Sequence, residues 1–160
     1  MSWLRALMLL ALIVWIGGIV FFAFVEAPTV FTVLPTRELA GNVVSRSLAA
    51  LHWMGLISGL VFLFCSIVYN QMKHADARLF SAAHVLLFVM LALTAVSQFR
   101  LTPRMQALRA EMHTIDNVPV SDARRVEFNR LHEWSTRAEG GVLLCGLVVV
   151  VLTARRESSR

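Results

Sequence analysis

The sequence predicts an all-α fold, an integral membrane four-helix bundle with a helical extramembrane segment between the third and fourth helices. Three observations lead to this prediction. The chain of 160 residues is 58% hydrophobic, well above an ordinary soluble domain. Its apolar residues form unbroken blocks instead of alternating with polar ones at helical spacing. Most blocks have the length of about 20 residues with which a helix crosses the roughly 30 Å hydrocarbon slab.

Four spans are expected within a single transmembrane domain that covers residues 1–160. Charge-free runs occupy residues 6–25, 48–69 and 79–99, with residues 26–47 as the loop between the first two. The fourth span is expected at about 134–154, because a helix extending back through Trp134 lengthens the short apolar run 140–154. We interpret the first run as a retained anchor and not a signal peptide, because it has full spanning length without a cleavage pattern behind it.

Two helices are expected outside the membrane, at about 103–113 and 122–133. Thr102 followed by Pro103 is typical of a helix start with Thr102 as the N-cap. Ser121 or Asp122 suits the N-cap of the second helix. That helix is expected to run into the fourth span and to carry an ion pair between Glu133 and Arg137, which stand four residues apart.

Small and aromatic residues indicate how the spans pack. Gly55 and Gly59 have the GxxxG spacing that lets membrane helices approach closely. We expect them to pack within the chain, although the sequence also allows a homo-oligomer. Trp15 lies mid-span and is expected to pack inside. The other tryptophans fall near span ends, where interfacial anchors lie: Trp3, Trp53 and Trp134.

Charge and composition limit the classes of function. The net charge of +5 is better explained by basic residues beside membrane ends than by nucleic-acid binding, so the expected partner is the lipid bilayer, in the cell membrane. Cys65 and Cys145 lie inside predicted spans without metal-site or disulfide-framework spacing. The sequence has no nucleophile elbow and no phosphate-binding glycine loop, which gives an enzyme little support.

Ionisable residues from all four spans are expected at one end of the bundle. We call the end that holds both termini side A and the opposite end side B. Glu26, His52, Arg100 and His132 are all expected near side B, with Gln98 at the same level. Because ionisable groups within a membrane are costly and tend to pair and to mark function, we expect a binding site there. Glu26 would pair with Arg100, and His52 would face His132.

Other interpretations of this polar set stay open. The residues are equally expected if they are interfacial groups that end each helix, and this is our interpretation of Arg137 and Glu139. No cofactor is predicted, but two histidines from different helices suit haem, with His52 and His132 as axial ligands, and two histidines with a glutamate suit a divalent metal. A third alternative is a membrane scaffold that recruits a soluble partner, itself unknown, through the basic helices of residues 103–137.

Several short motifs resemble one known family. They are Trp15-Ile16-Gly17-Gly18, Phe21-Phe22, Ala27-Pro28, Phe31 and Leu39-Ala40-Gly41, followed by "RLTPRM" and "LHEWS". Together they resemble the transmembrane protein 205-like family, also described as domain of unknown function 4149. The resemblance implies a small protein with four membrane helices and no established activity. The motif positions that it brings to this chain carry no assigned role: Trp15, Gly17, Pro28, Arg100, Pro103, His132 and Ser135.

Overall fold

The computed structural model describes residues 2–73, 82–112 and 115–158, and it confirms the all-α prediction. Four helical rods make up this part of the chain, and its residues form no strand. The first rod consists of α1 (Ser2–Phe21), η1 (Phe22–Glu26) and α2 (Ala27–Val33), and the second is α3 (Arg37–Lys73). The third rod consists of α4 (Ala82–Val96), η2 (Ser97–Leu101) and α5 (Thr102–Met112). The short turn η3 (Ile115–Asn117) precedes the fourth rod, α6 (Ala123–Ser158).

Each rod is long and apolar enough to cross a membrane. The rods also reach beyond the apolar runs, because α2 and the first turns of α3 occupy most of residues 26–47, which the sequence analysis assigned to a loop. Only residues 34–36 separate the first two rods. The fourth rod is continuous from Ala123, as expected. The protein is therefore a multi-pass membrane protein whose helices extend past the hydrocarbon slab at side B.

Two widened helical turns replace the expected breaks at the prolines. The π-helical segments η1 and η2 end two residues before Pro28 and Pro103. Each contains the residue four positions before its proline, Phe24 or Phe99, whose carbonyl group has no proline N–H to bind. A π turn accommodates this missing hydrogen bond without ending the helix. Thr102 is accordingly not an N-cap, because its backbone is helical and the chain passes straight through it.

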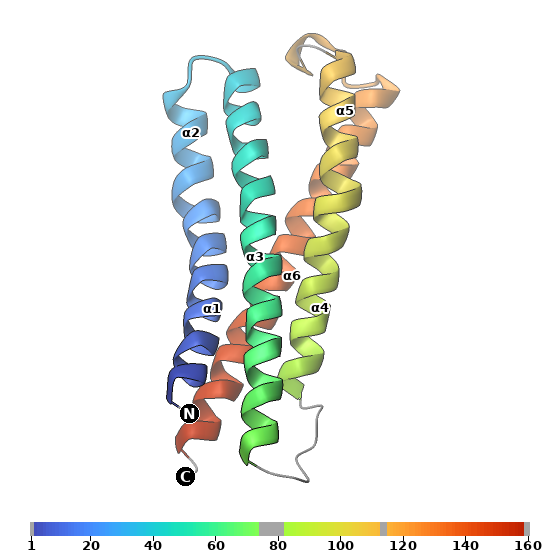
Figure 1. The fold of residues 1–160 in the computed structure, drawn as a ribbon. Coiled ribbons are helices and arrows are strands. Elements are labelled where there is room, and N and C mark those ends of the chain that lie inside the picture. Colours follow the sequence, from blue (N-terminus) through green and yellow to red (C-terminus); the bar gives the residue numbers. More distant parts are fainter. Residues whose placement is uncertain (1, 74–81, 113–114, 159–160) are drawn as a thin grey trace.

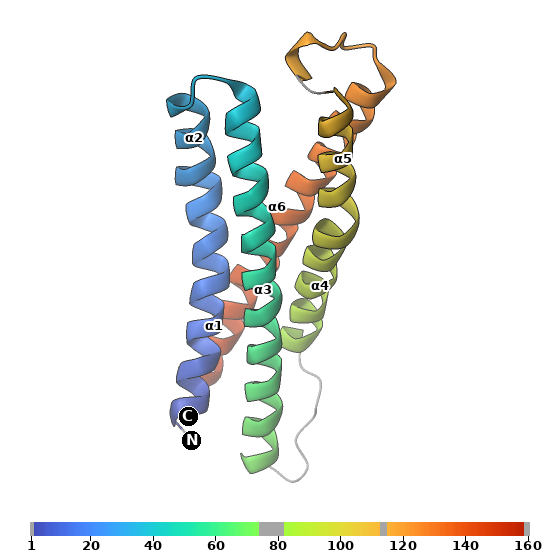
Figure 2. The ribbon, with the colours of Figure 1, turned by 45° about the horizontal axis from the view of Figure 1, so that its top comes forward.

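The rods form two antiparallel hairpins. The first rod packs along α3 and the third along α6, while α3 also packs on α4, and α1 on α6. Figure 1 shows both chain ends at the same end of the bundle, as four spans require. Figure 2 shows that the ends of α2 and α3 at side B lie apart from those of α5 and α6. The two hairpins therefore diverge towards side B, where side chains of α3 and α5 still meet across the gap.

Trp15 is the centre of the packed middle of the bundle. Its side chain is 1% exposed, and it lies against the backbone of α3, where a Cβ atom at Gly55 would be 2.3 Å from Trp15 Nε1 and one at Gly59 would be 2.7 Å from Trp15 Cζ3. Leu87 and Met90 of α4 are fully buried in the same cluster. As expected, the GxxxG glycines pack within the chain, and the surface that they face is a tryptophan ring.

The start of α6 is fixed by local charge pairs outside the membrane. Asp122 is its N-cap, and Asp122 Oδ1 accepts a hydrogen bond of 2.8 Å from the backbone N–H of Arg124. The Arg124 side chain also binds the carboxylate, and these hydrogen bonds lower the pKa of Asp122 to about 2. A lowered carboxyl pKa means that the cap contributes at neutral pH and weakens only as the pH falls from about 4 through 2. Farther along α6, the predicted ion pair of Arg137 with Glu133 forms at 2.6 Å.

The close packing of Trp15 against Gly55 and Gly59 can be tested with a matched control. We expect G55A to lower the free energy of unfolding by about 1–3 kcal/mol, because the added methyl group overlaps the indole and the buried ring has no free space to move into. The control is G17A, at a mid-helix glycine where a Cβ atom would meet nothing within 4 Å. Chemical unfolding in detergent micelles measures both. Equal stability of the two variants would contradict the packing.

Candidate functional site

The most deeply buried ionisable group at the side B end is the imidazole of His52. It is 1% exposed and hydrogen-bonds to two other rods through both ring nitrogens. Nδ1 lies 3.0 Å from Gln98 Oε1 in η2, and Nε2 lies 2.6 Å from Glu139 Oε1 in α6. The Glu139 side chain is 17% exposed. The His52–Gln98–Glu139 cluster therefore ties α3, the third rod and α6 together.

The atoms in these two contacts decide which of them donates the hydrogen. Gln98 Oε1 only accepts hydrogen bonds, so His52 Nδ1 is the donor of the first contact. The contact between Nε2 and the carboxylate oxygen needs a second proton, carried by one atom or the other. In either case both ring nitrogens of His52 have a hydrogen-bond partner inside the bundle.

Unpartnered hydroxyl groups surround the cluster on the third rod. The side-chain oxygens of Thr94, Ser97 and Thr102 are buried and have no hydrogen-bond partner in the described structure. Thr94 and Thr102 stand one turn to either side of Gln98, and Ser97 is adjacent to it. Buried hydroxyl groups normally find a hydrogen-bond partner. Three hydroxyl groups without a partner within nine residues therefore indicate a place for water or a polar ligand.

A cavity of about 250 Å³ opens above the cluster, between the separated ends of the hairpins. Its floor includes Leu48 and Thr102, which stand four residues, or about 6 Å of helix rise, from His52 and Gln98. Its apolar walls and its polar groups come from α2, α3, α5, the turn η3 and α6. The polar and charged lining residues are Arg37, Glu38, Ser45, Thr102, Gln106, Arg109 and His132.

The two ion-pair partners proposed from the sequence do not meet. Glu26 is half-buried at the end of η1, and Gly18 of the same rod lies beside Leu51, the neighbour of His52. Eight residues separate Gly18 from Glu26, so Glu26 stands about 12 Å nearer to side B than His52. Arg100 is exposed. It follows Gln98 by two residues and therefore points to another side of its helix.

His132 does not face His52, so this expected pairing is wrong. Its ring is exposed, lies parallel to that of Phe128 at 6.3 Å between centroids, and lines the cavity. The partner from α6 is Glu139, which the sequence analysis had interpreted as an interfacial residue. Both residues lie on one face of α6, since seven positions make two turns. The interfacial interpretation fits the exposed Arg137, whose guanidinium pairs with Glu133.

Sequence reasoning identified the correct end of the bundle but missed two of the three residues in the cluster. Gln98 was placed at this level and then passed over because it carries no charge. A usable signal was its chemistry, since a buried imidazole needs an acceptor as well as a donor or carboxylate. Glu139 had a weaker signal, because its position four residues after the buried Ser135 puts both on one face of α6.

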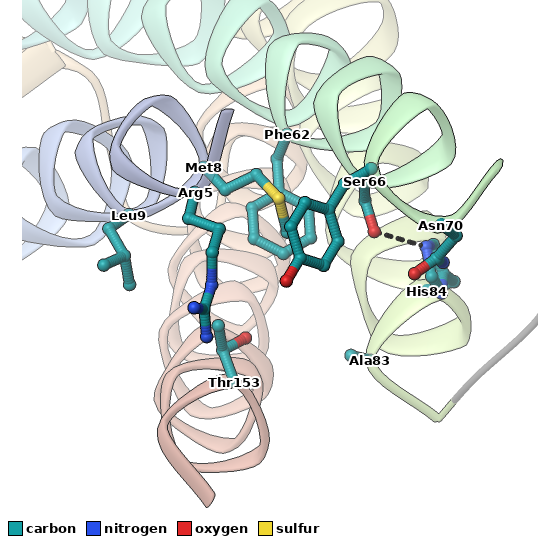
Figure 3. A pocket seen from close by; sticks show the side chains of 10 residues that line it. Arg5, Met8, Leu9, Phe62, Ser66, Asn70, Ala83, His84 and Thr153 are labelled. Carbon is teal, nitrogen blue, oxygen red and sulfur yellow. Dashed lines mark hydrogen bonds between the residues drawn. The ribbon is translucent and has the colours of Figure 1, made fainter. Parts of the chain in front are cut away.

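A second, smaller polar cavity lies at side A. It has a volume of about 80 Å³ and is lined from all four rods. Figure 3 shows Ser66 of α3 pointing to His84 of α4, with a hydrogen bond of 2.9 Å between Ser66 Oγ and His84 Nε2. The guanidinium of Arg5 lies 5.7 Å from the centroid of the Tyr69 ring. Polar groups thus enter the bundle from both ends, and the layer of Trp15, Leu87 and Met90 lies between them.

The buried cluster does not fit the haem or metal alternatives. Both nitrogens of His52 are engaged by Gln98 and Glu139, so neither presents a free lone pair to iron or zinc. His132 lies at the cavity, two turns of α6 from Glu139, and is not placed as a second axial ligand. Among the described residues, no group of three or more His, Cys, Asp or Glu is placed to hold a metal ion.

Comparison with known proteins identifies the family but no activity. A model of a domain of unknown function, DUF4149, matches residues 10–114, well over half of the chain. The chain belongs to the DUF4149 family. The match includes His52 and Gln98 and ends before α6, the helix that supplies Glu139. Neither the curated proteins nor the solved structures give a match.

The partners of His52 lead to a stability prediction. We expect E139A to lower the free energy of unfolding by about 1–3 kcal/mol, because it leaves a buried ring nitrogen without a partner. The control is E133A on the same helix, which removes an ion pair whose side chains are both more than 60% exposed and should change stability by about 0.5 kcal/mol or less. Unfolding in detergent micelles compares the two, and an E139A protein as stable as E133A would contradict the hydrogen bond.

Proposed function

We propose that this protein is a small binding or permeation module of the cell membrane, with its polar site at side B. The site consists of the end cavity and, below it, the His52–Gln98–Glu139 cluster. The observation that carries this proposal is a buried imidazole whose two hydrogen bonds reach two other rods directly under an open cavity. Ionisable residues kept at membrane depth commonly mark a site for a polar solute or a proton.

Two further features support binding more than free passage. The unpartnered hydroxyl group of Thr102 gives a polar solute a hydrogen-bonding partner between the cavity and the cluster, and those of Ser97 and Thr94 lie beside Gln98 and one turn beyond it. Farther towards side A, Trp15 packs against Gly55 and Gly59 and closes the bundle. A solute that enters from side B therefore reaches His52 and stops, unless the tryptophan layer moves.

A scaffold that uses the basic helices of residues 103–137 has less support. Arg104, Arg124 and Arg137 each contact a carboxylate of the same chain at 2.8 Å or less. These pairs reduce the positive charge that an acidic partner would meet. Within the DUF4149 family, we also propose membership of the transmembrane protein 205-like group, which is supported by the motifs around Trp15, Pro28 and Pro103.

Cysteine accessibility tests this proposal. In a C65S/C145S background, T102C and S97C should react with a small water-soluble thiol reagent applied to side B of sealed vesicles, with T102C the faster. The control is L87C, whose position is fully buried in the apolar layer and should stay unreactive. If T102C reacts no faster than L87C, the cavity is not an aqueous binding site and the proposal fails.

A fourth variant distinguishes a binding module from a permeation path. Ser66 lies in the side A cavity, beyond the tryptophan layer. In a binding module, S66C reacts only with reagent applied to side A. If S66C also reacts from side B, the tryptophan layer opens and the protein is a permeation path.

A further inference from the structure

We propose that the side B cavity binds an anionic amphiphile, a single acyl chain with a carboxylate or phosphate head, and that Arg109 holds the head. This inference rests on the proposed function and names the class of ligand for the same site.

The lining of the cavity is more basic than acidic. Arg37, Arg109 and His132 line it, and Glu38 is its single acidic residue among the described lining. Gln106 and Thr102 add neutral hydrogen-bonding groups. Such a lining favours a negatively charged group over a cation.

Arg109 is held in place by its surroundings, and the nearby charge of Glu38, which also lines the cavity, acts on its guanidinium. Its guanidinium lies against the backbone of Gly41, where a Cβ atom would be 2.8 Å from Nη1, and 5.4 Å from the centroid of the Phe128 ring. Its described hydrogen bond is a long one, from Nη1 to Asn42 Oδ1 at 3.4 Å. By contrast, Arg104 on the same helix makes two hydrogen bonds of 2.8 Å to Glu127. The guanidinium of Arg109 is therefore held in position and has further N–H groups to donate to a planar or tetrahedral oxyanion.

The rest of the cavity suits hydrocarbon. Phe31, Val44, Leu48, Met105 and Phe128 form most of its apolar wall. A volume of about 250 Å³ is near the lower end of the usual range for small-molecule pockets, about 300–1,000 Å³. A head group and the first part of a chain fill it, and the remaining chain lies against lipid-facing residues such as Phe31, which is 50% exposed.

The depth of these groups matches the orientation of a lipid. Gly41 precedes the apolar run 48–69 by seven residues, so Arg109 beside it lies about 10 Å outside the hydrocarbon slab, at head-group level. Leu48 and Thr102 lie at the edge of the slab. An amphiphile in the side B leaflet therefore places its charge at Arg109 and its chain along the apolar wall without turning over.

Thermal stabilisation by a defined set of amphiphiles tests the proposal. The purified protein in neutral detergent is heated with laurate, dodecyl phosphate, dodecanol or dodecyltrimethylammonium. Both anions should raise the midpoint of unfolding, because a ligand that binds the folded state stabilises it by mass action, and the alcohol and the cation should not. Laurate and dodecyl phosphate distinguish a fatty acid from a phosphate-headed lipid as the preferred source of the anion.

The variants assign the effect to one residue. R109Q should weaken laurate binding about tenfold or more, as expected for the loss of a charged hydrogen-bonding partner. R104Q is the matched control, because it removes one positive charge from the same helix outside the cavity lining, and it should leave binding unchanged. R109K keeps the charge without the planar fork and should bind with intermediate affinity, which provides a folded variant if R109Q does not fold.

Three results would overturn the proposal: equal stabilisation by dodecanol, no stabilisation by either anion, or equal loss of binding in R104Q and R109Q. Its failure is distinguishable from that of the proposed function. If T102C is accessible but the anions do not bind through Arg109, the cavity is a site for another ligand. If T102C is inaccessible, the binding module itself is rejected.

Discussion

The structure depends on giving both ring nitrogens of one buried imidazole, that of His52, a hydrogen-bond partner inside the membrane protein. Water is scarce at that depth, so each ring nitrogen of His52 needs a partner from the protein. Gln98 and Glu139 supply these partners from two other rods and thereby fix how far α3, the third rod and α6 are displaced along one another. Apolar side chains alone specify that displacement poorly, because lipid and helix surfaces are similarly apolar.

The two π turns contribute to the same end of the bundle. Each lets a rod continue past a proline, so α2 and α5 extend the hairpins beyond the hydrocarbon slab and form the walls of the cavity. The turn in the third rod also carries Gln98. An ordinary α-helical turn has a different residue spacing around its axis, so the widened turn influences which side chains of residues 97–101 face His52. π turns occur often at functional sites, and here one of them bears a member of the buried cluster.

The sequence was sufficient for the architecture because hydropathy reports directly on membrane spans. It also predicted the Trp15 core position, a helix cap at Ser121 or Asp122 and the Glu133–Arg137 pair, which are local features. The contacts among rods were harder to predict, because they depend on the axial register and rotation of each helix. His132 and Glu139 share a face of α6, so hydrophobic pattern alone does not choose between them, and an error of two turns selected His132. Arg100 was selected over Gln98 by charge, although residues two apart point to different sides.

The tryptophan layer has a consequence for how the protein experiences the membrane potential. The His52–Gln98–Glu139 cluster lies about 6 Å inside the side B edge of the slab, and the side A cavity enters the bundle from the other end, so the strictly apolar part is thinner than the full hydrocarbon slab of about 30 Å. A transmembrane voltage falls mainly across the region of lowest dielectric constant, and the electric field is accordingly strongest around Trp15, Leu87 and Met90. An elementary charge that crosses this thin layer experiences most of the available energy, about 2.3 kcal/mol per 100 mV, over a shorter distance than in plain lipid.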